Sequence, residues 1–203
     1  MKNKDYKELY NIQVNRLGIK LPYLKDFFLK QKDIISKAKR LLTDERNIAF
    51  LLVPSITWEE LIGIAENNNN KKQINTPFGL SNITDRFNTP TRRPYFIFNI
   101  NTESTRNHAP NNIIDDKKKR FLTAYETLSF IAHTEVLQSC NLWSLGSGQG
   151  RNWQIIPGIS CKRKKVGQKI EVDKIALHFS LKEEVEAFRN WSSPFRSYEI
   201  EAM

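Results

Sequence analysis

The sequence predicts an α+β fold, with an N-terminal helical hairpin and further helices packed on a mixed, mainly antiparallel sheet. Apolar side chains recur at helical spacing near the N-terminus, and Thr-x-x-Glu capping boxes indicate where later helices begin. The apolar runs between these helices lack the regular alternation of βαβ units. A chain of 203 residues is long enough for a substantial core, because a domain of about 150 residues already buries roughly 68–70% of its surface on folding.

The N-terminal helical hairpin is predicted over residues 5 to 42. Two groups of apolar residues follow the helical period there, and Gly18 and Pro22 lie between the two groups. The mostly apolar run at residues 46 to 53 is closed by Pro54, which is typical of a short buried strand.

A capping box formed by Thr57 and Glu60 predicts a helix that continues to about Ala65. Residues 66 to 73 follow it and contain four asparagines and two lysines. Because such side chains do not form an apolar core, we expect a solvent-exposed loop or tip there.

After a polar, turn-rich stretch, residues 94 to 100 indicate a central strand. Pro94 stands at its first position, where the missing N–H does least harm. A second capping box, formed by Thr123 and Glu126, predicts a helix from residue 124 to about Leu137.

The stretch after this helix is typical of a β-hairpin. Residues 140 to 145 and 152 to 161 are apolar, aromatic and β-branched, and a glycine-rich loop at 146 to 151 separates them. The loop lacks the Gly-Lys-Ser/Thr of a phosphate-binding loop, so we expect a flexible hairpin tip. Trp143 and Trp153 are assigned to the core, although the same residues could form a base-stacking platform.

A last strand is predicted at residues 169 to 179. A third capping box at 180 to 183 predicts a final helix through Phe188, and little is expected to hold the chain after residue 192. The predicted division is an N-terminal helical segment at 1–44, an α+β domain at 45–192 and a tail at 193–203.

The formal charge of +10 is the strongest indication of a partner, because a positive surface attracts polyanions. The hypothesis is association with nucleic acid or another polyanion, and the alternative is a solvated basic surface without a ligand. Asp115 and Asp116 precede the first basic cluster, whereas the second has no nearby acid until Glu171. The candidate nucleic-acid-binding residues are Lys117, Lys118, Lys119 and Arg120, and Lys162, Arg163, Lys164 and Lys165.

Several features predict a cytoplasmic protein that does not span a membrane. Residues 1 to 8 are charged and lack the apolar segment of a secretory signal. No apolar run approaches the roughly 20 residues needed to cross a bilayer. The two cysteines suit a reducing compartment, although a bridge between Cys140 and Cys161 across the hairpin is an alternative.

No metal site and no cofactor are predicted, because the soft ligands are scattered without the two-to-four spacing of zinc sites. His133 is interpreted as a C-terminal helix residue favoured by the macrodipole. Cys161 precedes three basic residues that would lower a thiol pKa, so a reactive thiol and a structural one are both considered.

Two further functions remain open. The first is a small enzyme or ligand-binding domain with a pocket near the glycine-rich loop, and the second is a protein-interaction module that uses the N-terminal helices. The residues of the candidate pocket are Glu126, Ser147, Arg151 and Cys161.

Residues 94 to 180 resemble the C-terminal half of a bacterial domain family of unknown function. The resemblance rests on the Thr-x-x-Glu helix, on Leu137 and Cys140 before a strand, on the loop with Ser147, and on the strand with Pro157. The Arg-Val-Pro of that family is Ile-Ile-Pro here, and Lys-Val-Gly-Gln replaces its Gly-Trp segment. The resemblance implies a small bacterial α+β domain and implies no functional residue.

Overall fold

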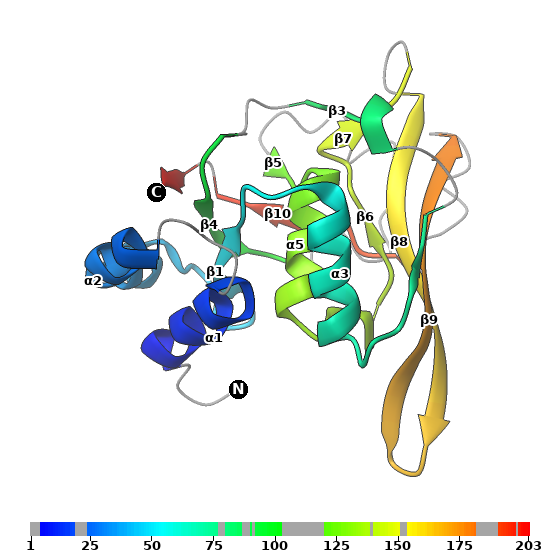
Figure 1. Cartoon of the computed structure of the whole chain (residues 1–203), viewed down its shortest axis with the longest axis horizontal. Coiled ribbons are helices and arrows are strands. Elements are labelled where there is room, and N and C mark those ends of the chain that lie inside the picture. Colours follow the sequence, from blue (N-terminus) through cyan, green and yellow to red (C-terminus); the bar gives the residue numbers. More distant parts are fainter. Residues whose placement is uncertain are drawn as a thin grey trace.

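The computed structural model describes residues 5–18, 24–76, 80–86, 90, 92–102, 120–138, 140–150, 154–181, 191–197 and 199–203. It confirms the α+β class, with helices and mainly antiparallel sheets in alternating layers. Figure 1 shows helices α1 and α2, then the sheet that contains β1 and β4, then helices α3 and α5, and finally the sheet that contains β8 and β9.

The predicted helical hairpin is confirmed as α1 (Tyr6–Gly18) and α2 (Leu24–Leu41). It packs on a three-stranded sheet of order β1-β4-β11, formed by β1 (Ile48–Val53), β4 (Tyr95–Ile100) and β11 (Ile200–Ala202). Successive side chains of a strand point to opposite faces of the sheet. Because almost all residues of β1 and β4 are apolar, the sheet is apolar on both faces. Phe96 and Phe98 face α1 and α2, whereas Ile97 faces the core beneath α3 and α5.

The C-terminal residues are held more firmly than the sequence indicates. β11 pairs with β4, and β10 (Phe195–Arg196) pairs with β5 (Arg120–Phe121), both antiparallel. The expectation that little holds the chain beyond residue 192 is therefore wrong. The pattern was missed because strands of two or three residues are too short to show periodicity.

Helix α3 (Trp58–Asn68) begins at the predicted capping box between Thr57 and Glu60. It runs three residues beyond the predicted end, into the asparagines, and Asn69 is buried. The Nδ2 atom of Asn69 donates to the carbonyl oxygens of Ala65 at 2.8 Å and Ile131 at 3.1 Å. The prediction of a solvent-exposed loop is thus wrong for residues 66 to 69. One asparagine amide can donate hydrogen bonds to carbonyl oxygens at the ends of two helices at once.

Helix α5 (Ala124–His133) likewise begins at its predicted capping box, between Thr123 and Glu126. It ends four residues before the predicted end, and a 3-10 turn at η2 (Val136–Gln138) follows it. α3 and α5 lie side by side in Figure 1, with their first turns at the same end.

The second large sheet has the order β2-β9-β8-β6. Its strands are β2 (Ile74–Asn75), β9 (Lys169–Leu181), β8 (Ile155–Val166) and β6 (Leu142–Trp143). The predicted pairing of β6 with β8 and the predicted strand β9 are confirmed. Ser180 belongs to β9 and opens no helix at this point, and residues 182 to 190 lie outside the described residues.

The first part of the glycine-rich loop is buried, so the prediction of a flexible tip is wrong there. Gly146 and Ser147 lie in the interior, and β7 (Ser147–Gly148) pairs with β3 (Thr84–Asp85). A Cβ atom on Gly146 would lie 2.4 Å from the backbone oxygen of Phe121, so only glycine fits at this position. A 3-10 turn at η1 (Leu80–Asn82) precedes β3.

No helix within the described ranges combines the length and the apolar composition that crossing a membrane requires.

Candidate nucleic-acid interface

Strands β8 and β9 form a long antiparallel hairpin whose end projects beyond the rest of the molecule (Figure 1). Its turn contains Gly167, whose φ of 62° lies in the left-handed region that glycine favours. The second basic cluster of the sequence therefore lies within a strand, and not in a loop after one. Between residues 162 and 174 the hairpin carries six basic and two acidic residues, a net charge of +4.

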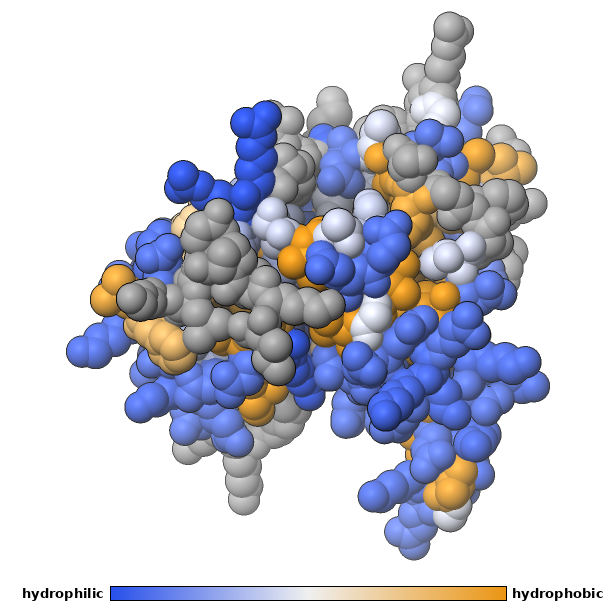
Figure 2. Space-filling model, viewed as in Figure 1, coloured by the Kyte–Doolittle hydropathy of each residue, from blue (hydrophilic) through white to orange (hydrophobic). Residues whose placement is uncertain are grey.

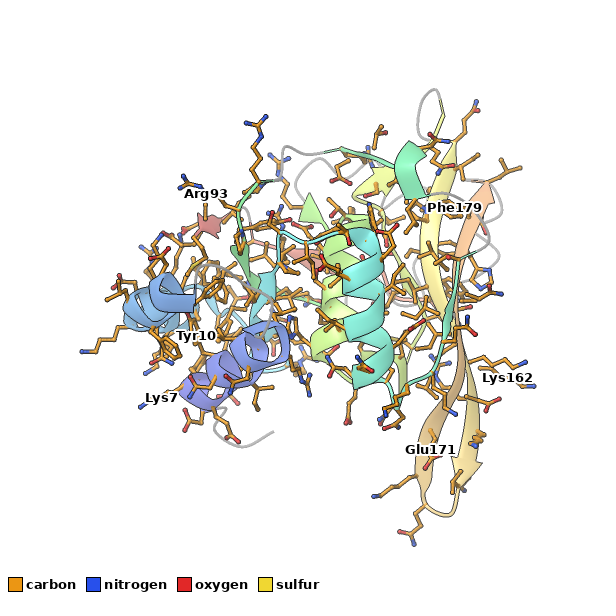
Figure 3. All side chains as sticks on the ribbon, in the orientation of Figure 1. Lys7, Tyr10, Arg93, Lys162, Glu171 and Phe179 are labelled. Carbon is orange, nitrogen blue, oxygen red and sulfur yellow. The ribbon has the colours of Figure 1, made fainter. Side chains whose placement is uncertain are left out.

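The pairing register distributes these charges over two faces of the hairpin. Cross-strand partners share a face, and a bulge near residue 173 shifts the register by one residue, so that Lys174 lies opposite Lys162. One face, called here the lysine face, carries exposed lysines that extend away from the body of the molecule, as Figure 3 shows for Lys162. It consists of Lys162, Lys164, Lys169 and Lys174, together with Glu171.

Arg163 does not belong to the lysine face, although the sequence placed it in the same cluster. Its side chain turns toward the body, where Nε donates to the carbonyl oxygen of Leu137 at 2.7 Å and Nη2 donates to Asn141 Oδ1 at 3.0 Å. Lys165 is opposite Ile170 on that inner face. Of the four predicted residues, Lys162 and Lys164 therefore lie on the lysine face. Arg163 and Lys165 lie on the other face, where Arg163 connects the base of the hairpin to the body by hydrogen bonds.

Lys162 and Lys174 are directly opposite one another across the two strands. Like charges at such a position destabilise a sheet. Within the described part of the chain, neither side chain forms an ion pair with a carboxylate. A bound anion would relieve this repulsion.

The first basic cluster does not extend this surface in the described part of the chain. Lys117, Lys118 and Lys119 lie outside the described residues. Arg120 lies in β5, which Figure 1 places at the opposite end of the molecule from the hairpin turn.

The candidate pocket residues are not brought together. Cys161 Sγ donates to the carbonyl oxygen of Leu137, beyond the C-terminal end of α5. Glu126 and Ser147 instead lie near the first turn of α5, at the other end of this helix. Arg151 lies outside the described residues.

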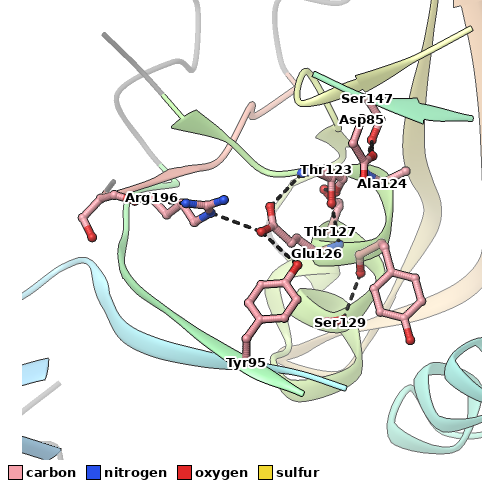
Figure 4. A network of polar contacts seen from close by, with 11 residues as sticks. Asp85, Tyr95, Thr123, Ala124, Glu126, Thr127, Ser129, Ser147 and Arg196 are labelled. Atoms are coloured by element: carbon pink, nitrogen blue, oxygen red, sulfur yellow. Dashed lines mark hydrogen bonds and ion pairs between the residues drawn. The ribbon is translucent and has the colours of Figure 1, made fainter. Parts of the chain in front are cut away.

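Glu126 and Ser147 instead belong to a buried network, shown in Figure 4. The Glu126 carboxylate accepts hydrogen bonds from Thr123 N at 2.9 Å, from the Tyr95 hydroxyl at 3.2 Å and from Arg196 Nε at 3.2 Å. Burial raises the pKa of Glu126, and Arg196 opposes that rise. Ser147 Oγ accepts a hydrogen bond from Ala124 N at 2.7 Å. Glu126 and Ser147 therefore accept hydrogen bonds from backbone N–H groups at the start of α5, and Glu126 also holds Arg196 of the C-terminal segment.

A cleft of about 220 Å³ lies beside this network, between the first turns of α3 and α5. Trp58 and Tyr125 form one wall, with ring centroids 5.0 Å apart in an edge-to-face arrangement. The Tyr125 hydroxyl donates to the Ile56 carbonyl at 2.7 Å, and burial raises the pKa of Tyr125 to about 12. The Tyr125 ring is thus held in the cleft wall by a hydrogen bond, and its hydroxyl is protonated at neutral pH.

Cys161 has the features of a structural thiol. Burial raises the pKa of Cys161, although Arg163 acts in the opposite direction, so the thiol remains protonated at neutral pH. Cys140 and Cys161 are not joined by a disulfide bond.

His133 is the last residue of α5, as predicted, but it is not a charged residue favoured by the macrodipole. Burial, together with nearby Arg16, lowers the pKa of His133 to about 3. The Leu52 backbone acts in the opposite direction on this pKa, but burial outweighs it. His133 is therefore a neutral core residue.

Among residues 26 to 41 of α2, whose side chains the structure describes, the exposed large apolar residues are Phe28 and Leu29, which are 58% and 78% exposed. The other exposed positions in this range are polar or charged, so no apolar stripe runs along this part of the helix. Trp143 is buried and stacks on Trp191, which confirms its place in the core.

Histidine, cysteine and carboxylate side chains do not gather into a metal-binding group anywhere in the described part of the chain. Comparison with protein-family models, with curated protein sequences and with solved structures found no match to this chain. The resemblance of residues 94 to 180 to a bacterial domain family therefore stays a prediction, and the hairpin has to be interpreted from its own chemistry.

Proposed function

We propose that the protein binds duplex nucleic acid through the β8–β9 hairpin. The observation that carries the proposal is the opposed, unneutralised pair Lys162 and Lys174 on a hairpin that projects from the fold. Lysine–phosphate contacts release counterions and supply most of the sequence-independent affinity for nucleic acid.

A duplex is favoured over a single strand because of the side chains that the hairpin lacks. Proteins that bind single strands stack bases on aromatic residues. Residues 162 to 174 contain no aromatic residue. A two-stranded β-ribbon can also enter a groove of the duplex, either the major or the minor one.

The test replaces three residues of the lysine face, in the triple variant K162Q/K164Q/K169Q. Arg163 is left intact, since its hydrogen bonds to Leu137 and Asn141 stabilise the hairpin base. Binding to a fluorescent 20-base-pair duplex is followed by anisotropy over a series of salt concentrations. We expect weaker binding and a log–log salt slope that is shallower by about 2.7, at about 0.9 for each lost contact on B-DNA.

The matched control is K7Q/K32Q/K71Q, which removes the same charge from exposed lysines outside the hairpin. The control should retain the slope of the unmodified protein. The proposal fails if the unmodified protein does not bind the duplex at low salt, or if the two triple variants bind equally.

A further inference from the structure

Two apolar side chains are exposed at the end of the basic hairpin. Val166 is 47% and Ile170 is 50% exposed, and they lie on either side of the turn at residues 167 and 168. Figure 2 shows the hairpin as a hydrophilic projection with an apolar area near its end. Because the hairpin projects from the body, these side chains do not pack on the core clusters.

The pairing register gives this end the form of a wedge. Val166 is opposite Lys169 on the lysine face, and Ile170 is opposite Lys165 on the inner face. Each apolar side chain therefore has a lysine directly across from it. Valine and isoleucine are stiff at χ1, so the wedge keeps its shape when it is pressed against a ligand.

We infer that Val166 and Ile170 insert between base pairs of the bound duplex and bend it. This inference rests on the proposed function. Apolar side chains that enter the minor groove unstack a base step and kink the duplex by about 20–90°. Lys164, Lys165 and Lys169 surround the wedge and are placed to hold the phosphates beside the opened step.

A duplex suits this end better than a membrane surface does. Side chains that anchor a protein at a membrane interface gather on one apolar face. Val166 and Ile170 instead emerge from opposite faces of the hairpin, among lysines. Two separated aliphatic side chains match the two sides of an opened base step.

The experiment measures the end-to-end distance of a 30-base-pair duplex by energy transfer between dyes at its ends. The duplex contains a central TA step, which is easily unstacked. We expect energy transfer to rise when the unmodified protein binds. V166S/I170S should bind with the same salt slope, with a dissociation constant weaker by less than about tenfold, because unstacking offsets much of the energy of apolar burial. The rise in energy transfer should disappear.

The matched control is F28S/L29S, which removes two exposed apolar residues from α2 and should still bend the duplex. Binding by the unmodified protein without a change in energy transfer overturns the inference and leaves the proposed function standing. No binding to the duplex overturns the proposed function itself. Vesicles that contain anionic phospholipid are tested in parallel by co-sedimentation. Vesicle binding that V166S/I170S abolishes, with no bending of the duplex, assigns the wedge to a membrane and overturns the inference.

Discussion

The buried contacts of Glu126 show what local sequence can and cannot predict. The capping box with Thr123 is a contact between residues three positions apart, so its spacing predicts it. The contact with Arg196 joins residues 70 positions apart, and no local pattern indicates it. Prediction from sequence therefore found the helix start and missed the ion pair that holds the C-terminal segment against it.

Arg196→Met should destabilise the fold by roughly 3–5 kcal/mol, because it leaves the buried Glu126 carboxyl without its cation. The double variant E126Q/R196M should recover most of this loss, since glutamine still accepts a hydrogen bond from Thr123 N. Urea unfolding of the three proteins measures the difference. Equal stability of Arg196→Met and the unmodified protein would contradict the role of the pair.

Acid should destabilise the protein through His133. Its pKa is about 3 in the folded state and about 6.5 when unfolded, so the unfolded chain binds more protons between these values. The stabilisation is complete above about pH 6.5 and is lost as the pH falls toward 3. Between pH 7 and 4.5 the loss should amount to about 2–3 kcal/mol.

The measurement compares urea unfolding at both pH values for the unmodified protein and for His133→Leu. The pH responses of the other ionisable groups, including Glu126, are common to both proteins. The difference between the two pH responses therefore reports on His133. Parallel pH responses would show that the imidazole is accessible to protons in the folded protein.

At the scale of elements, the sequence predicts a helix or strand where a pattern extends over at least two helical turns or about six strand residues. α1 and α2 are predicted from helical periodicity, β1 and β4 from apolar runs and β9 from alternation, and the type and place of all five are confirmed. β10 and β11 were missed because each is too short to show a period. The end of α3 was misplaced because asparagine disfavours the helix interior. Here the amide of Asn69 donates a hydrogen bond to a carbonyl oxygen of the neighbouring helix α5.

Asn69→Ala should lower stability by roughly 2–3 kcal/mol, because it removes a buried donor from the Ala65 and Ile131 carbonyls. Asn67→Ala is the control, since Asn67 is exposed and its replacement should change stability by less than about 0.5 kcal/mol. Thermal unfolding compares the two variants. Equal melting temperatures would show that the asparagine segment is only a spacer.

The candidate interface was likewise predicted only in part from the sequence. Basic residues 162 to 165 were predicted from composition alone, but composition does not assign faces. The register places Lys169 and Lys174 beside Lys162 and removes Arg163 from the surface that faces a ligand. Recognising Gly167 as the turn of a hairpin would have predicted the faces of residues 163 to 172, because alternation on paired strands then fixes each face. It would not have predicted that Lys174 lies opposite Lys162, because that pairing depends on the bulge at residue 173.

For the whole molecule, the residues that stabilise the packed layers are separate from the lysines that are proposed to bind nucleic acid. Both faces of the β1-β4-β11 sheet are covered, and α3 and α5 lie between this sheet and the second one. The predicted division at residues 44 and 192 stays a prediction. The lysine face lies on the part of the second sheet that extends past this core, so charge can be changed there without altering the packed layers.

The separation of 70 positions between Glu126 and Arg196 also has a consequence for synthesis on the ribosome. At about 5–20 residues per second, the chain between them takes roughly 4–14 s to make. Through that interval the first turn of α5 lacks its cation, and β4 lacks its neighbour β11. The nascent chain therefore exposes a strand edge and apolar helix surface to chaperones until β10 and β11 have been synthesised.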